Sequence, residues 1–171
     1  MCGQRKILFS PDKLPYAQGK RPDVDCILCA VRDSAGGIER LVVHESSHFF
    51  VTLNLFPYNP GHLMIVPHRH LEEISEFNKD EIYDCHELQL LAIQVLRRMY
   101  NPRGFNLGYN MGESSGASIP HLHMHIVPRY RSEVGFMDVI NGARIIVESP
   151  EETRKRMREN FEALKVQEDS K

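Results

Sequence analysis

The stretch HLHMHIVPR, residues 121–129, constrains the fold more than any other part of the chain, because polar and apolar residues alternate along it. Successive side chains of a β-strand point to opposite faces of the sheet. A strand here would place His121, His123 and His125 on one face and the intervening apolar residues on the other. We expect the apolar face to pack on a helix and the histidine face to line a cleft. The alternative, surface histidines on a half-exposed strand, is disfavoured by the strict alternation.

Two kinds of site use histidines in such a row. A zinc site would need the three imidazoles to converge on one ion. Along a strand the first and third histidines lie roughly 13 Å apart at Cα, so one metal cannot easily take all three. In the other kind of site, one imidazole nitrogen attacks phosphorus while the second donates to a backbone carbonyl and fixes the tautomer. The spacing therefore favours a nucleophilic histidine.

The rest of the chain predicts an α+β fold with an antiparallel sheet of about five strands, one long helix and a C-terminal helix. Short runs rich in Val, Phe, Thr and Leu, separated by turn residues, are typical of strands. They predict four strands besides the histidine stretch: 40–45, 48–56, 62–68 and 104–112.

The long helix is expected over 79–100. Asn78 and Glu81 form a capping box at its start, and an Asn-Pro pair follows its end. Apolar residues recur at steps of three or four from Ile82 to Met99, which predicts that this face of the helix is buried.

The two ends of the chain differ in pattern. Residues 1–25 are rich in Pro, Lys and Asp without a clear period, and we expect an irregular arm. Near the other end, Ser149 is a helix cap, a proline follows it, and Glu152 is at the third helical position. These signals predict a helix over about 150–164.

Composition limits the possible partners and compartments. The chain has 171 residues, 42% of them hydrophobic, and a net charge of −2, so it gives no global electrostatic reason to expect a nucleic acid or an anionic membrane as partner. It contains no apolar run approaching the roughly 20 residues of a membrane span, and no signal-peptide block. We expect a cytoplasmic protein, whose four cysteines then do not form stable disulfides.

The loop GESSGAS, residues 112–118, precedes the histidine stretch. It offers backbone N–H groups together with the hydroxyls of Ser114, Ser115 and Ser118. Such loops form nests for phosphate oxygens. A flexible connector is the alternative interpretation, but the adjacent histidines favour a phosphate loop.

Cys26 and Cys29 form a C-x-x-C pair. The pair could be redox-active, although no thioredoxin-like strand and helix surround it, or it could be two unconnected thiols. Half of a tetrahedral Zn²⁺ site is the interpretation that we favour, with two histidines as the remaining ligands.

Three quoted segments together resemble one family. HLHMHIVPR resembles the signature of the histidine triad (HIT) family of nucleotide hydrolases and transferases, LNLFPYNPGHLMIVPHRH its upstream strand–turn–strand, and NMGESSGASIPH its phosphate loop. The resemblance covers about 26–130 and is greatest to the branch of diadenosine tetraphosphate phosphorylases and dinucleoside polyphosphate hydrolases. It implies a HIT-like fold, with 26–130 as the domain core, 131–171 as an extension that carries the last helix, and a homodimer.

The resemblance also implies roles for individual residues. His123 would be the nucleophile that attacks the α-phosphorus of a nucleotide and forms a nucleotidyl-histidine intermediate. His125 would contact the phosphate, His62 would support the nucleophile from the neighbouring strand, and Asn54 would hold the ribose. Four loop residues match positions near the phosphates, with Ser118 as a possible donor to the leaving oxygen: Asn110, Gly116, Ala117 and Ser118. Relatives often have a polar residue where this chain has Ala117.

Members of the family that have this C-x-x-C complete a structural zinc site with two histidines that correspond to His70 and His121 here. The resemblance therefore implies one zinc ion per chain, held by these two residues together with the two cysteines. If His70 points away, His48 is the alternative ligand. The remaining histidines outside the matched positions are expected to be ordinary surface or packing residues: His44, His68 and His86.

The expected activity is nucleotidyl transfer from a dinucleoside polyphosphate to water or to phosphate. Members of the phosphorylase branch often have one more residue between loop and triad than this chain has. Three alternatives remain: an adenosine phosphoramidate hydrolase of the same family, a nucleotide-binding regulator with little catalysis, and a hydrolase that uses zinc catalytically.

Overall fold

The computed structural model describes residues 23–35, 37–131, 133 and 148–168. Within them the chain forms ten elements, in the following order: α2 (Ile27–Asp33), β1 (Val42–Glu45), β2 (Phe49–Leu53), β3 (Leu63–Pro67), the 3₁₀ helix η2 (Ile74–Glu76), α3 (Lys79–Tyr100), β4 (Gly104–Tyr109), the 3₁₀ helix η3 (Glu113–Ser115), β5 (Met124–Arg129) and α5 (Pro150–Glu168).

The five strands form one sheet in the order β1-β2-β3-β5-β4, and each neighbouring pair is antiparallel. Every residue of β2 and β3, at the centre, is buried. Their register pairs Phe49 with Pro67 and Leu53 with Leu63. The connection between the two strands, residues 54–62, therefore lies at one end of the sheet. The predicted α+β class with an antiparallel sheet is confirmed. In the described part of the chain, no helix combines the length and apolar character needed to cross a membrane.

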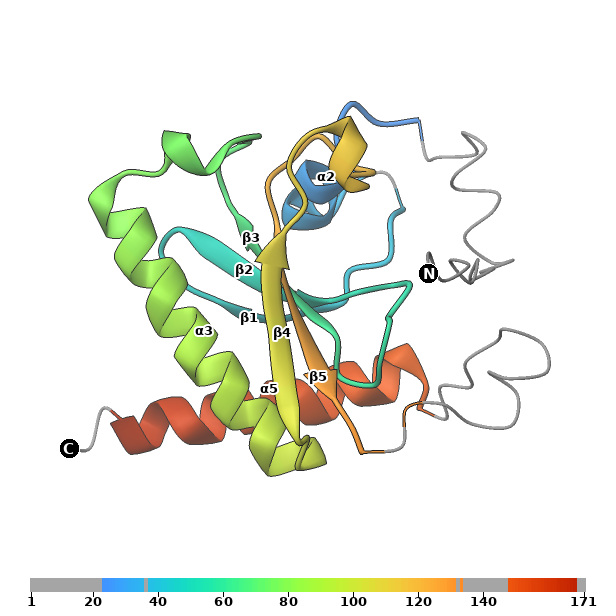
Figure 1. The fold of residues 1–171 in the computed structure, drawn as a ribbon, viewed down its shortest axis with the longest axis vertical. Coiled ribbons are helices and arrows are strands. Elements are labelled where there is room, and N and C mark those ends of the chain that lie inside the picture. The colour runs from blue at the N-terminus through green and yellow to red at the C-terminus, as the bar shows by residue number, and fades with distance from the viewer. Residues whose placement is uncertain (1–22, 36, 132, 134–147, 169–171) are drawn as a thin grey trace, which may run out of the picture.

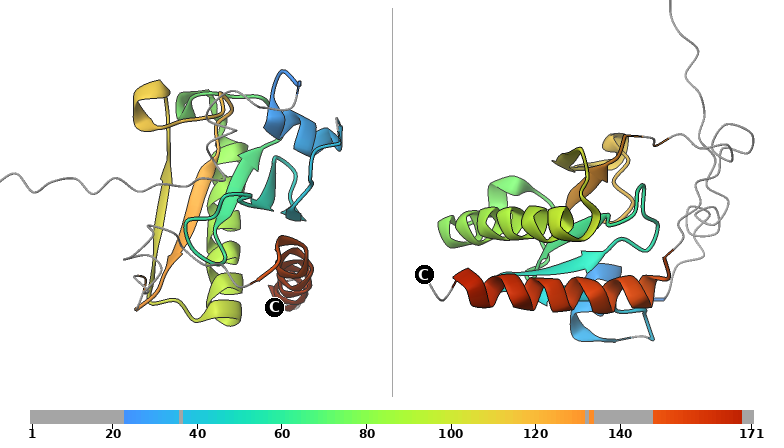
Figure 2. Two further views of the ribbon diagram at one scale, coloured as in Figure 1. Left: turned by 90° about the vertical axis from the view of Figure 1, so that its right-hand side faces the viewer. Right: turned by 90° about the horizontal axis from the view of Figure 1, so that it is seen from below.

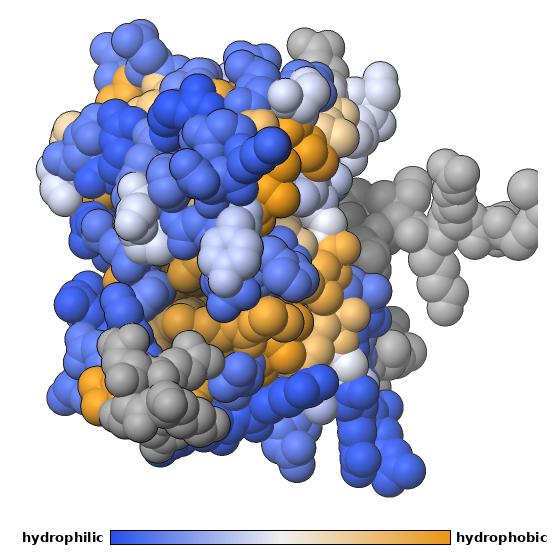
Figure 3. Space-filling view, turned by 90° about the vertical axis from the view of Figure 1, so that its left-hand side faces the viewer, coloured by the Kyte–Doolittle hydropathy of each residue, from blue (hydrophilic) through white to orange (hydrophobic). Residues whose placement is uncertain are grey.

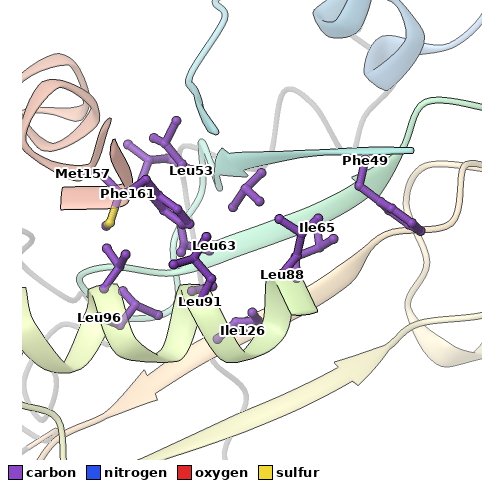
Figure 4. Close-up of a cluster of buried hydrophobic side chains, with 14 of the residues drawn as sticks. Phe49, Leu53, Leu63, Ile65, Leu88, Leu91, Leu96, Ile126, Met157 and Phe161 are labelled. Atoms are coloured by element: carbon purple, nitrogen blue, oxygen red, sulfur yellow. The ribbon is translucent and has the colours of Figure 1, made fainter. Parts of the chain in front are cut away.

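Helices cover the two faces of the sheet unequally (Figures 1 and 2). One face packs against α3 and α5 in a large cluster that includes Ile65, Leu88 and Phe161 (Figure 4). On the other face a smaller cluster joins Phe50 and Val66 to α2. Because side chains alternate along each strand, the same strands supply both clusters.

The predicted boundaries of α3 are confirmed, and so is its capping box. The Asn78 side chain accepts from the Glu81 backbone N–H, and the Glu81 carboxylate accepts from that of Asn78, both at 2.9 Å. The predicted burial of Ile82 is wrong, since 56% of its surface is exposed. Glu81 is buried at this turn instead, because its carboxylate also receives the Arg69 guanidinium at 2.7 Å.

Other boundaries differ from those predicted. Strand β5 starts at Met124, so the first two histidines precede it. The strand expected to end at residue 56 stops at Leu53, because the Asn54 side chain turns back to accept from the Phe56 N–H. Helix α5 continues to Glu168. Helix α2 was not predicted, and most of the arm expected over 1–25 lies outside the described residues.

Candidate functional site

A cleft lies on the α2 side of the sheet. It is bounded by α2, by the chain that follows β2, by the loop after β4 and by the start of β5. Six residues predicted for the site line this cleft: Asn54, Asn110, Gly116, Ser118, His123 and His125. His62 and Ala117 are not among the lining residues. The fold thus brings together segments that are up to 98 positions apart in the sequence, from Ile27 to His125.

The apolar half of the cleft was missed by the sequence reasoning. Helix α2 contributes Ile27, Leu28 and Val31, and Ile38 continues this wall. Glu39 is the one carboxylate among the described lining residues. Ile27 and Leu28 lie within the C-x-x-C, and Val31 follows Leu28 at a helical spacing of three, which is the one local signal that could have revealed this wall.

His123 is buried, and its orientation is fixed by the main chain. Its Nδ1–H donates to the His121 carbonyl at 2.7 Å. This hydrogen bond leaves the lone pair of the neutral ring on Nε2. Burial lowers the pKa of His123, which also favours the neutral ring. The arrangement has the form expected of a nucleophilic histidine.

His62 and His125 form a hydrogen-bonded chain beside His123. The Tyr58 backbone N–H donates to His62 Nδ1 at 3.1 Å, so the proton of neutral His62 resides on Nε2. That Nε2–H faces His125 Nδ1 at 3.0 Å. The proton of neutral His125 therefore resides on its own Nε2. The rings of His123 and His125 lie nearly perpendicular, with centroids 4.9 Å apart. The structure thus connects His62 to the cleft through His125.

A glycine turn places His62. Gly61 has a φ of +76°, a conformation that other residues rarely adopt. A Cβ on it would lie 2.9 Å from Leu96 Cδ2 and 3.0 Å from Tyr100 Cε2, both on α3. The turn therefore packs directly on the helix, and it fixes the imidazole that follows it.

The loop after β4 forms a short 3₁₀ turn. Both the backbone N–H and the hydroxyl of Ser115 donate to the Gly112 carbonyl, the hydroxyl at 2.8 Å. Ser115 therefore closes the turn, whereas Ser118 lines the cleft. Gly116 has a φ of +88°, which explains the glycine there.

The four predicted metal ligands converge beside the cleft, and we call them the Cys/His tetrad: Cys26, Cys29, His70 and His121. Their ligand atoms all lie within 4.8 Å of one another. His121 Nδ1 lies 3.3 Å from Cys26 Sγ and 3.5 Å from Cys29 Sγ, and His70 Nδ1 lies 3.4 Å from Cys29 Sγ.

The geometry of the tetrad fits a tetrahedral ion. Zinc bonds of about 2.0–2.3 Å would separate neighbouring ligand atoms by roughly 3.3–3.8 Å. His121 Nε2–H donates to the Pro67 carbonyl at 3.0 Å, which leaves its Nδ1 lone pair directed at the thiols. Burial lowers the pKa of His121 to about 4, so this nitrogen is unprotonated at neutral pH. These residues could therefore hold a metal.

Three of the remaining histidines have contacts elsewhere, and the fourth, His86, is exposed on α3. His48 donates to the Asp84 carboxylate at 3.1 Å and is not part of the tetrad. His44 stacks on Phe161 with ring centroids 5.0 Å apart. His68 lies against Phe50.

Comparisons with known proteins identify the family of the chain. A HIT domain model matches residues 35–132. The chain is 39% identical over 118 residues to the AP-4-A phosphorylase of Mycobacterium tuberculosis, and the aligned region covers 68% of this chain and 60% of that protein. It is 27% identical over 88 residues to the bis(5'-nucleosyl)-tetraphosphatase (asymmetrical) of Schizosaccharomyces pombe, which covers 52% of this chain and 48% of that protein. The chain thus spans less than two thirds of either relative.

The fold also matches solved structures. A hypothetical histidine triad nucleotide-binding protein from Sulfolobus tokodaii superposes with a TM-score of 0.68 at 26% identity, over 82% of this chain and 94% of that one. The HIT model covers more than half of the present chain. The chain therefore belongs to the HIT domain family.

Proposed function

We propose that the protein transfers a nucleotidyl group from a dinucleoside polyphosphate through a covalent intermediate on His123. The observation that carries the proposal is the hydrogen bond from His123 Nδ1–H to the His121 carbonyl. This bond leaves the lone pair of the neutral imidazole on Nε2, and His123 lines the cleft. The two relatives described above are named for reactions of such substrates, and their names support this substrate class.

The reaction comprises two displacements. In the first, His123 Nε2 bonds to the α-phosphorus, and the bond from that phosphorus to its bridging oxygen breaks. The nucleoside polyphosphate leaves as an anion, to which the Ser118 hydroxyl donates a hydrogen bond. In the second, an oxygen of water or phosphate bonds to phosphorus, the P–N bond breaks, and the imidazole is neutral again, while the proton of an attacking water passes to solvent. Water gives a nucleoside monophosphate, and phosphate gives a diphosphate.

The remaining cleft residues position the substrate. His125 Nε2–H donates to a phosphate oxygen. His62 keeps His125 in the required tautomer by donating its Nε2–H to His125 Nδ1. The loop from Asn110 to Ser118, with Gly116 and Ala117, surrounds the other phosphate oxygens, and Asn54 holds the ribose. Positioning and charge stabilisation of this kind supply most of the catalysis in phosphoryl transfer.

We further propose that the Cys/His tetrad holds one structural zinc ion. When bound, the ion would keep both thiols deprotonated and tie three segments of chain together. The fit of the ligand distances and the lone pair of His121 Nδ1 support this assignment. Metal analysis of the purified protein, with Cys26→Ser/Cys29→Ser as the control, tests it; equal zinc content in the two proteins would refute it.

A homodimer is also proposed. Strand β4 is the last strand of the sheet, and Leu107 in its middle is 41% exposed. Exposed strand edges favour pairing with another strand. Beside it, α3 exposes Ile82, Tyr83 and Leu90, and apolar surface is visible on the side where α3 lies (Figure 3). Sedimentation equilibrium tests the proposal, and the mass of one chain at micromolar concentration would contradict it.

The decisive experiment follows the products of diadenosine tetraphosphate. With His123→Asn we expect turnover to fall at least about 10³-fold, because the nucleophile is lost, while nucleotide binding persists. His48→Ala, which changes a partly exposed histidine outside both the cleft and the tetrad, is the matched control and should be unaffected. Normal turnover by His123→Asn would refute the mechanism. ADP that forms only when phosphate is added would identify phosphorolysis, and AMP without phosphate would identify hydrolysis.

A further inference from the structure

Helix α2 stands between the Cys/His tetrad and the cleft. Cys26 caps the helix, since its Sγ accepts from the Cys29 N–H at 3.5 Å, and Cys29 lies in the first turn. Ile27, Leu28 and Val31 of the same helix line the apolar half of the cleft. One element therefore carries two tetrad residues and a wall of the candidate nucleotide site.

Tertiary anchors must hold this helix in place. It has only seven residues, and helices shorter than about 12 residues are marginal in water without packing. Leu28 and Val31 pack on the smaller apolar cluster of the sheet, and the Arg32 guanidinium donates to the His68 carbonyl. The contacts from Cys26 and Cys29 to the two histidines secure its other end.

The tetrad also reaches the candidate nucleophile. The imidazole of His121 is held on both sides, by the thiols at Nδ1 and by the Pro67 carbonyl at Nε2. The backbone carbonyl of this same residue accepts the proton of His123 Nδ1. A displacement of the His121 ring would move the group that orients His123.

We propose that the tetrad, with zinc bound, positions two parts of the nucleotide site at once: the apolar wall through α2 and the nucleophile through the His121 carbonyl. This inference rests on the proposed nucleotide site. None of the four tetrad residues is among the described residues that line the cleft, so the role is one of positioning. Nucleotide affinity should then depend on a metal that the nucleotide does not touch.

His70 offers the sharpest test, because the two cysteines lie at the start of α2 and His121 lies two residues before His123. A change at His70 alters neither of these segments directly. In the full chain carrying His123→Asn, which prevents turnover, we compare His70→Ala with His70→Cys. The second change keeps a ligand set that zinc accepts, three cysteines and one histidine. His48→Ala is the control, since His48 lies outside both the tetrad and the cleft. Zinc content and the dissociation constants of ADP and GDP are measured for each protein.

We expect His70→Ala to lose zinc and to bind the preferred nucleotide about 10-fold more weakly or worse, which is the usual effect of losing a supporting contact. We expect His70→Cys to retain both zinc and affinity, and His48→Ala to match the parent. A folded His70→Ala protein that has lost zinc but binds nucleotide like the parent would overturn the inference, as would one that keeps its zinc.

Chelation of the intact protein provides a second measurement if His70→Ala does not fold. Removal of zinc should speed hydrogen exchange in α2 and leave exchange in α3 unchanged, and it should weaken nucleotide binding. Unchanged exchange and binding after zinc loss would overturn the inference. If the zinc-loaded parent binds neither ADP nor GDP, the proposed nucleotide site fails instead, so the two failures are distinguishable.

Discussion

The two faces of the sheet are built in different ways. Two helices of 22 and 19 residues close one face, and the largest apolar cluster lies beneath them. On the other face a helix of seven residues covers a small cluster and leaves a cleft that contains the candidate catalytic histidines. The first face supplies most of the apolar packing that stabilises the fold. Because that packing is sufficient, the second face can remain partly uncovered and contain a cleft. Substitutions on the two faces should therefore have separable effects.

The largest effect on stability is expected from Phe161→Ala. Phe161 lies on α5 with none of its surface exposed, and its removal should cost about 3–5 kcal/mol because it leaves a cavity. Urea denaturation measures the loss. The catalytic rate per folded molecule should stay within a factor of two, because no cleft residue is touched. A rate that falls while stability is kept would break the distinction between the faces.

Gly61→Ala should have an intermediate effect on both properties, because the turn joins the two faces. The new Cβ would meet Leu96 and Tyr100 on α3, and the positive φ is unfavourable for alanine. We expect a loss of about 1–3 kcal/mol in the free energy of unfolding. Turnover should fall as well, since the turn positions His62. Gly104→Ala, at a site with nothing within 4 Å of a Cβ, is the matched control.

His44 should have the smallest effect, and only in acid. Burial lowers its pKa first, and Lys165 lowers it further. The unfolded chain therefore binds this proton more readily than the folded one, so the folded state loses stability as the pH falls below the unfolded value of about 6.5. His44→Gln should reduce the difference in urea midpoint between pH 7.5 and pH 5.5. An unchanged difference would show that its stacking on Phe161 does not depend on protonation.

The same contrast separates what the sequence could predict from what it could not. Helix α3 has a capping box and a sustained apolar period, so its bounds follow from local signals. Ile82 misled this reasoning because the ion pair of Glu81 with Arg69 takes the buried position at that turn. Local patterns are dependable where one element packs on a broad core.

On the cleft side, local sequence patterns predict less of the structure. The seven residues of α2 show no full amphipathic period, and the helix is secured by tertiary contacts that the sequence does not display. The alternation from His121 onward predicts the strand but not its start, because the His121 carbonyl bonds to an imidazole instead of a neighbouring strand. The histidines themselves were found from their spacing, and the tetrad from family resemblance.

The peptide N–H of residue 58 has a consequence for redesign of this site. It sets the proton positions of His62 and then His125, yet it belongs to the main chain. The Tyr58 ring also stacks on the His62 imidazole with centroids 4.9 Å apart, so a substitution there must keep an aromatic side chain to preserve this contact, and proline is excluded because it lacks the N–H. A library that reshapes the cleft around bulkier leaving groups should therefore limit this position to aromatic residues.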